Sequence, residues 1–191
     1  MRRHIPAALV AALVLLAGCS GDDEPRPRIA PTDSSSVAST TAPPPTPTGP
    51  VEPTLPAEAA GEDAAAAEAF VRHYWAMADY AQATGDVVAF RRLGAPSCGA
   101  CTAAADFVQG VYAKGGEISG GETQISRIDS TRLESGGGVS FQVKLVVSNS
   151  AQVVDHAGQK QDETFPADRV SANFVVEFAG SGWVVSFWEA A

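Results

Sequence analysis

Apolar side chains follow two different periods in the C-terminal two thirds of the chain. Between residues 62 and 114 they recur every three or four positions, as Phe70, Tyr74 and Met77 do, which is typical of helices. From residue 122 to residue 187 they alternate with polar side chains, which is typical of strands with one buried face. Helices followed by a run of strands joined by short turns indicate an α+β fold with an antiparallel sheet.

Three helices are predicted, over residues 62–84, 87–93 and 102–114. In the first, Phe70, Tyr74, Met77 and Ala81 form one apolar face. Gly85 is a natural end for this helix, because glycine adopts the left-handed conformation without strain, and Asp86 is placed to cap the second helix. A catalytic role for Asp86 is the alternative. In the third helix the spacing favours Phe107 and Val111 as inward-facing residues.

Four strands are predicted, over residues 122–133, 139 to about 154, 170–179 and 183–187. A glycine-rich turn at residues 135–138 and a polar loop at 155–162 separate them. The second strand has the clearest alternation, with Val139, Phe141, Val143, Leu145 and Val147 on one face. Residues 57–191 are therefore predicted to form one domain, in which three N-terminal helices pack on a curved four-stranded antiparallel sheet.

Leu16-Ala17-Gly18-Cys19 closes an apolar run and has the form of a lipobox, the processing site of a bacterial lipoprotein. Arg2 and Arg3 precede this run, which is roughly 13 residues long and too short to span a membrane as a helix. Residues 1–18 are predicted to be a signal peptide, and Cys19 is predicted to carry lipid that holds the protein on the extracytoplasmic face of the cell membrane. The alternative is an ordinary cleaved signal peptide with an incidental Cys19.

Residues 19–56 are predicted to be a disordered tether that follows the lipidated cysteine. The segment holds 10 of the 13 prolines, many serines and threonines, and no aromatic residue, so it cannot bury enough apolar surface to offset its ordering entropy. Its composition also fits O-glycosylation, and recognition by a proline-binding partner is a further alternative.

The formal net charge is −9 and becomes −11 after removal of residues 1–18, which contain two arginines and no acids. An acidic chain does not favour nucleic acid as a partner. We predict no cofactor and no metal. A zinc site built on Cys98 and Cys101 would need two more ligands, and His73 and His156 are the histidines of the domain.

Cys98 and Cys101 form the sharpest chemical motif, because two cysteines separated by two residues precede a predicted helix. In an oxidising compartment the pair is expected to form a disulfide that fixes the turn before the helix. The alternative is a redox-active pair, since a helix N-terminus lowers the pKa of the first thiol. The strand that precedes a thioredoxin-type motif is missing here, because Arg91, Arg92 and Pro96 occupy that stretch.

The order of three helices and four strands resembles the cone-shaped fold of the nuclear-transport-factor-two-like (NTF2-like) group. That resemblance implies a curved sheet around a long helix, with a pocket that Tyr74, Trp75, Tyr80 and Tyr112 would line. We expect the tyrosines to be core residues with satisfied hydroxyl groups, and the pocket lining is the alternative. No catalytic residues are predicted.

A closer resemblance rests on several features taken together: the lipobox, the tether, Tyr80-Ala81-x-Ala83-Thr84-Gly85-Asp86 and Cys98-x-x-Cys101. These features are similar to those of an uncharacterised family of actinobacterial lipoproteins with a domain of unknown function. The resemblance covers most of residues 54–191 and implies no assigned active site.

The sequence thus predicts a lipid-anchored extracytoplasmic domain that binds a cell-envelope protein, a wall fragment or a small apolar ligand. Two enzymatic alternatives stay open. One is a thiol–disulfide oxidoreductase that uses Cys98 and Cys101, and the other is a cone-fold enzyme of the isomerase or hydratase type.

Overall fold

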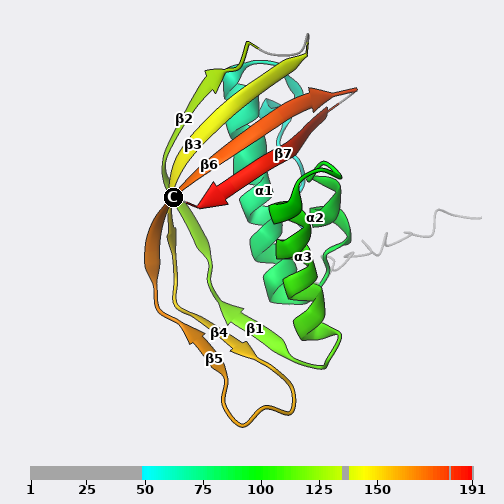
Figure 1. The fold of residues 1–191 in the computed structure, drawn as a ribbon, viewed down its shortest axis with the longest axis vertical. Coiled ribbons are helices and arrows are strands. Elements are labelled where there is room, and N and C mark those ends of the chain that lie inside the picture. Colours follow the sequence, from blue (N-terminus) through cyan, green and yellow to red (C-terminus); the bar gives the residue numbers. More distant parts are fainter. Residues whose placement is uncertain (1–48, 135–137, 181, 191) are drawn as a thin grey trace, which may run out of the picture. The chain divides into compact units, whose positions relative to one another are not determined.

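Along the chain of the domain, the helices come first and the strands follow (Figure 1). The computed structural model describes residues 49–134, 138–180 and 182–190. The predicted signal peptide, Cys19 and the tether up to residue 48 lie outside the described residues. A short 3₁₀ helix, η1 (Ala57–Ala60), precedes three α-helices, which are α1 (Ala64–Thr84), α2 (Val88–Arg92) and α3 (Gly99–Tyr112).

The strands form two antiparallel sheets. The four-stranded sheet has the order β2-β3-β6-β7 and the three-stranded sheet has the order β1-β4-β5. Their bounds are β1 (Glu117–Gly120), β2 (Thr123–Arg132), β3 (Val139–Asn149), β4 (Gln152–Asp155), β5 (Glu163–Phe165), β6 (Asp168–Ala179) and β7 (Gly182–Ala190). The α+β class, the three α-helices and the antiparallel pairing are confirmed, but the single sheet of the prediction is wrong because a second sheet is present.

The second sheet continues three strands of the first beyond a common bend (Figure 1). β1 leads into β2, β3 leads into β4 and β5 leads into β6, each across two connecting residues. The order β1-β4-β5 therefore matches the order β2-β3-β6. The connecting residues are Gly121-Glu122, Ser150-Ala151 and Pro166-Ala167. The predicted strand from Val139 toward Val154 is thus two strands that belong to different sheets.

Local sequence fixes both ends of α1. The Asp63 carboxylate accepts a hydrogen bond from the Ala66 amide at 2.9 Å, which caps the first turn. Gly85 has a φ of +76° and its amide donates to the Ala81 carbonyl, so it ends the helix as predicted. Asp86 accepts from the Val88 amide at 3.0 Å, but the N-cap of α2 is Val87, so the predicted cap lies one residue before the cap position.

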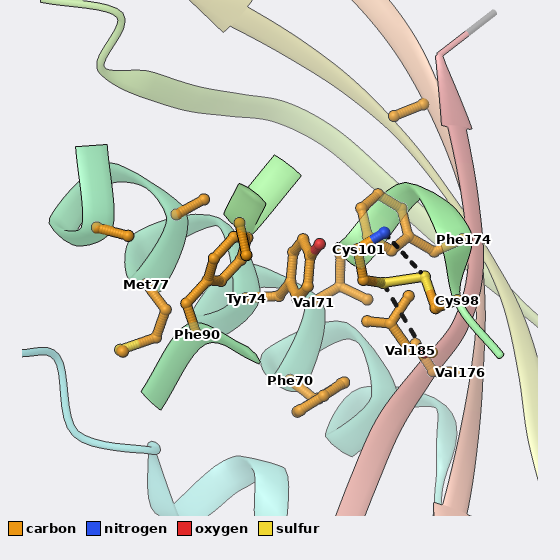
Figure 2. Close-up of a cluster of buried hydrophobic side chains, with 14 of the residues drawn as sticks. Phe70, Val71, Tyr74, Met77, Phe90, Cys98, Cys101, Phe174, Val176 and Val185 are labelled. Carbon is orange, nitrogen blue, oxygen red and sulfur yellow. Dashed lines mark hydrogen bonds between the residues drawn. A yellow bond between two sulfur atoms is a disulfide. The ribbon is translucent and has the colours of Figure 1, made fainter. Parts of the chain in front are cut away.

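The core lies between the helices and the inner face of the four-stranded sheet. Figure 2 shows Phe70 and Tyr74 of α1 on the side of Phe174 and Val176 of β6, and Met77 beside Phe90 of α2. The predicted inner faces are confirmed for α1, β3 and β6, whose predicted apolar residues are buried except for Val139 and Phe178, which are partly buried. Burial of this apolar surface is the main stabilising contribution to the fold.

Two predicted details are wrong. Phe107 of α3 is 42 % exposed, and the buried face of this helix consists of Cys101, Ala105, Val108 and Val111. In β7 the residue Ser186 is an extra residue opposite β6, so Phe187 faces outward and Trp188 packs on the core instead. The Ser186 hydroxyl donates to the Val175 carbonyl across this bulge at 3.2 Å.

Candidate functional site

The bend between the two sheets forms an open pocket of about 260 Å³, here named the bend pocket. Two cross-strand rows build its sheet wall, one on each side of the bend. In the four-stranded sheet, Thr123, Asn149 and Asp168 are register partners across β2, β3 and β6. In the three-stranded sheet, Gln152 of β4 is the register partner of Phe165 of β5. Residues far apart in sequence thus become neighbours through strand register.

Helix α1 supplies the opposite wall through residues one or two turns apart. Trp75 and Gln82 line the bend pocket, and Asp79 lies between them on the same helical face. The Asp79 carboxylate accepts two hydrogen bonds from Thr123, one from the amide at 3.1 Å and one from the hydroxyl at 2.8 Å. These bonds fix the first residue of β2 against the helix.

Hydrogen bonds between side chains hold the polar lining in place. The Asn149 amide group donates to the Asp168 carboxylate at 2.7 Å, and the Gln152 amide group donates to the Gln82 side-chain oxygen. The Ser150 hydroxyl accepts from the backbone amides of Gly121 and Glu122, each at 3.0 Å, and donates to the Glu122 carboxylate. The pocket therefore presents amides and hydroxyls in fixed positions, as ligand sites commonly do.

The electrostatics of the pocket are acidic. Burial raises the pKa of Asp79, and the hydrogen bonds from Thr123 oppose this effect. The bond from the Ser150 hydroxyl lowers the pKa of Glu122 and keeps that carboxylate ionised. Among the described residues that line the pocket, none is Lys, Arg or His.

Of the four aromatic residues predicted to line a pocket, Trp75 lines the bend pocket. Tyr74 lies in the core with Phe90 and Phe174 (Figure 2), and its ring centroid is 6.5 Å from that of Trp75. The Tyr112 hydroxyl donates to the Gln82 carbonyl at 2.6 Å, and Tyr80 packs against the core from a partly buried position. The structure thus brings one of the four to this site.

The Tyr74 hydroxyl corrects the expectation of satisfied tyrosines. It is buried without a hydrogen-bond partner among the described residues, as are the indole nitrogens of Trp75 and Trp188. The Trp188 indole lies close enough to act on the pKa of Tyr74, but the larger effect is burial, which raises that pKa. Phe174 and Trp188 stack with ring centroids 5.7 Å apart. The Trp75 ring packs against both of them.

Sequence reasoning missed the sheet wall of the pocket. Thr123, Asn149, Gln152 and Phe165 had no motif to mark them, because they become a site only through strand pairing. The sequence does carry one signal, because glycine and proline interrupt strands. Gly120-Gly121 and Pro166 lie at two of the three bend points.

Cys98 and Cys101 are joined by a disulfide at the start of α3 (Figure 2). The side chains are 1 % and 7 % exposed, and the Cys101 Sγ lies 3.9 Å from the Val185 carbonyl oxygen of β7. The segment Leu93–Ala95 exchanges two backbone hydrogen bonds with Val185 beside it. A Cβ at Gly94 would lie 2.6 Å from the Cys101 Cβ, so the disulfide packs where a side chain would not fit. This placement favours a structural role.

Removing both cysteines, as Cys98→Ala with Cys101→Ala, should lower the free energy of unfolding by about 2 kcal/mol, the chain-entropy value for so short a loop. Urea denaturation of the wild type with and without reductant measures the same quantity independently. The double variant serves as the control, since reductant should leave it unchanged. A wild type that is equally stable when reduced would contradict a structural role.

His73 and His156 do not belong to a group of metal ligands in the part of the chain that the structure describes. His156 lies 3.1 Å from the Glu163 carboxylate in the β4–β5 hairpin, and His73 is buried on α1, where burial lowers its pKa. The described residues contain no group of three or more His, Cys, Asp or Glu side chains placed to hold a metal ion.

A larger hollow of about 540 Å³ lies on the outer face of the four-stranded sheet. The register partners Asp129, Lys144, Asn173 and Glu189 cross it as one row. Mixed charges on an outer sheet face are typical of a solvated surface. The bend pocket is the better candidate, because a helix and both sheets contribute to its lining and it combines aromatic rings with fixed amides.

The fold and the pocket together define a small α+β domain with a ligand-sized site between its long helix and its bent sheet. This chain belongs to a family of unknown function, DUF6318, whose family model matches residues 38–188. A comparison with curated proteins finds no match. None of the helices in the described residues is long and apolar enough to cross a membrane.

Among solved structures, the intermembrane space region of the chloroplast protein ARC6 is similar, with 13 % identity and a TM-score of 0.52 over 67 % of this chain and 95 % of that chain. An NTF2-like protein with a cystatin-like fold from Novosphingobium aromaticivorans has 14 % identity and a TM-score of 0.38 over 65 % of this chain and 78 % of that chain. The first similarity shows a shared fold alone.

Proposed function

We propose that this protein is a lipid-anchored domain on the extracytoplasmic face of the cell membrane, and that it binds a ligand of the cell envelope in the bend pocket. The observation that carries the binding role is the pocket itself, in which Thr123, Asn149 and Asp168 form one registered row opposite Trp75. The lipobox at Leu16–Cys19 and the actinobacterial lipoprotein resemblance support the anchor.

Binding explains the site better than catalysis does. Both oxygens of the Asp79 carboxylate are bonded to Thr123, and the Asp168 carboxylate accepts from Asn149, so these acids already have partners. A general base must reach the proton that it removes, and these groups serve to fix β2, β3 and β6. The burial of Cys98 and Cys101 argues likewise against thiol–disulfide exchange, which needs an accessible sulfur.

The anchor predicts that Cys19→Ala abolishes labelling of the protein by an alkyne fatty-acid probe in growing cells. Each CH₂ group of a lipid chain that is buried in the membrane contributes about 0.8 kcal/mol to membrane binding. The variant lacks these chains, so it should also leave the membrane fraction. Cys98→Ala is the matched control and should keep the label. A wild type that takes no label and fractionates with the cytosol would contradict the anchor.

The binding role is tested by a photocrosslinker in intact cells. A benzophenone amino acid at position 165 lies in the pocket, and the same residue at position 187 lies on the outer face of β7. An adduct formed at 165 and not at 187 supports ligand binding in the bend pocket. Equal labelling at both positions, or none at either, counts against it.

A further inference from the structure

Two aromatic rings flank the bend pocket from different walls. Trp75 comes from α1, and Phe165 comes from the short edge strand β5, where it is 41 % exposed. An exposed ring at a pocket is apolar surface that a ligand can cover. A ligand with a flat apolar face would therefore gain from contact with Phe165.

The polar lining offers donors and acceptors without a positive charge. In the bond between Gln152 and Gln82, the Gln152 Nε2 donates and the Gln82 Oε1 accepts. The other end of each amide, the Gln152 Oε1 and the Gln82 Nε2, can therefore bond to a ligand. The bond from Asn149 to Asp168 likewise leaves over the Asn149 Oδ1. A wholly apolar ligand would bury these groups without partners, which is costly.

The charge around the pocket selects against anions. Asp168 lines the pocket, and the ionised Glu122 is bonded to Ser150 at its edge. No basic residue is found among the described lining residues to offset them. A carboxylate or phosphate ligand would meet like charge there, so the ligand that fits is not an anion.

The volume limits the size of the ligand. About 260 Å³ is slightly less than the range of roughly 300–1,000 Å³ that holds drug-sized molecules. A single six-membered ring with its substituents is the matching size. A pyranose ring has an apolar face of C–H groups and a rim of hydroxyl groups that both donate and accept hydrogen bonds.

We infer that the bend pocket binds one neutral pyranose ring of an envelope saccharide, with Phe165 against the ring face and Asn149, Gln82 and Gln152 bonded to its hydroxyl or amide substituents. This inference rests on the proposed binding function and narrows its ligand to one chemical class. It also disfavours the small apolar ligand that the sequence left open.

The test is calorimetric binding of N-acetylglucosamine, its neutral tetramer and glucuronic acid to the lipidated full-length protein in detergent. We expect saturable binding of the monosaccharide, with affinity at least about tenfold weaker for glucuronic acid. Phe165→Ala should weaken binding by about tenfold, since aromatic stacking makes a contribution of that order. Asn149→Ala should also weaken binding, because it removes an amide and keeps the ring.

The matched control is Phe187→Ala, since Phe187 is 45 % exposed but lies on the outer face of the sheet. It should leave the affinity unchanged. Three outcomes overturn the inference: no saturable binding of either neutral sugar, binding of the tetramer alone, or equal losses in both phenylalanine variants. If no sugar binds but the crosslinker at position 165 still gives its specific adduct, the saccharide class is wrong and the binding function stands. If both experiments fail, both proposals fall.

Discussion

Replacing Phe174 with alanine should lower the free energy of unfolding by about 3–5 kcal/mol. The side chain is fully buried at the centre of the aromatic cluster. Its ring centroid lies 5.5 Å from that of Tyr74, 6.1 Å from that of Trp75 and 5.7 Å from that of Trp188. The substitution removes apolar burial and leaves a cavity between α1 and β6 that these large rings cannot collapse to fill.

Urea denaturation followed by tryptophan fluorescence measures the loss. Phe187→Ala is the control, because the same deletion on the outer face of β7 should change the stability by less than about 1 kcal/mol. A loss of similar size in both variants would contradict the assignment of the core to the inner face of the four-stranded sheet.

Gly120→Ala should lower the free energy of unfolding by about 2–4 kcal/mol, because it strains the backbone at the bend between the sheets. Gly120 has a φ of +72°, where a side chain strains the backbone. A Cβ there would also lie 2.1 Å from the Ala151 carbonyl oxygen, which belongs to the connection between β3 and β4. Relief of that contact would require the two connecting segments to move apart. Because the same segments support the bend pocket, ligand affinity should fall as well.

Gly110→Ala is the matched control for this glycine. Gly110 lies in α3 with no atom within 4 Å of an added Cβ, so alanine should raise the stability by about 0.5–1 kcal/mol. Thermal unfolding of both variants gives the comparison. If Gly120→Ala proved as stable as the wild type, the bend would not depend on the left-handed conformation at residue 120.

The elements that the sequence predicted best are those in which local pattern and tertiary packing agree. The Phe70–Tyr74–Met77 face of α1 is buried, and Gly85 ends that helix as predicted. Phe107 was assigned to the wrong face because apolar spacing alone did not fix the rotation of α3. The disulfide places Cys101 inward, and Ala105 and Val108 follow one and two turns later.

The bend and its pocket could not be predicted from alternation. Ser150 and Ala151 interrupt the run of strand residues without a proline or glycine, and the change of sheet depends on pairing with distant segments. Gly121 and Pro166 mark the same bend in the neighbouring strands, but only strand register shows that these positions align. For the same reason Asn149 and Asp168, 19 residues apart, become a bonded pair only in the folded protein.

The central claim is that an anchored domain binds a ligand in the bend pocket, and the crosslinker at position 165 tests it most directly. In intact cells, the account predicts a discrete adduct in the membrane fraction from position 165 and no adduct from position 187. Labelling that is the same at both positions, or an unlabelled protein recovered from the cytosol, would contradict the account.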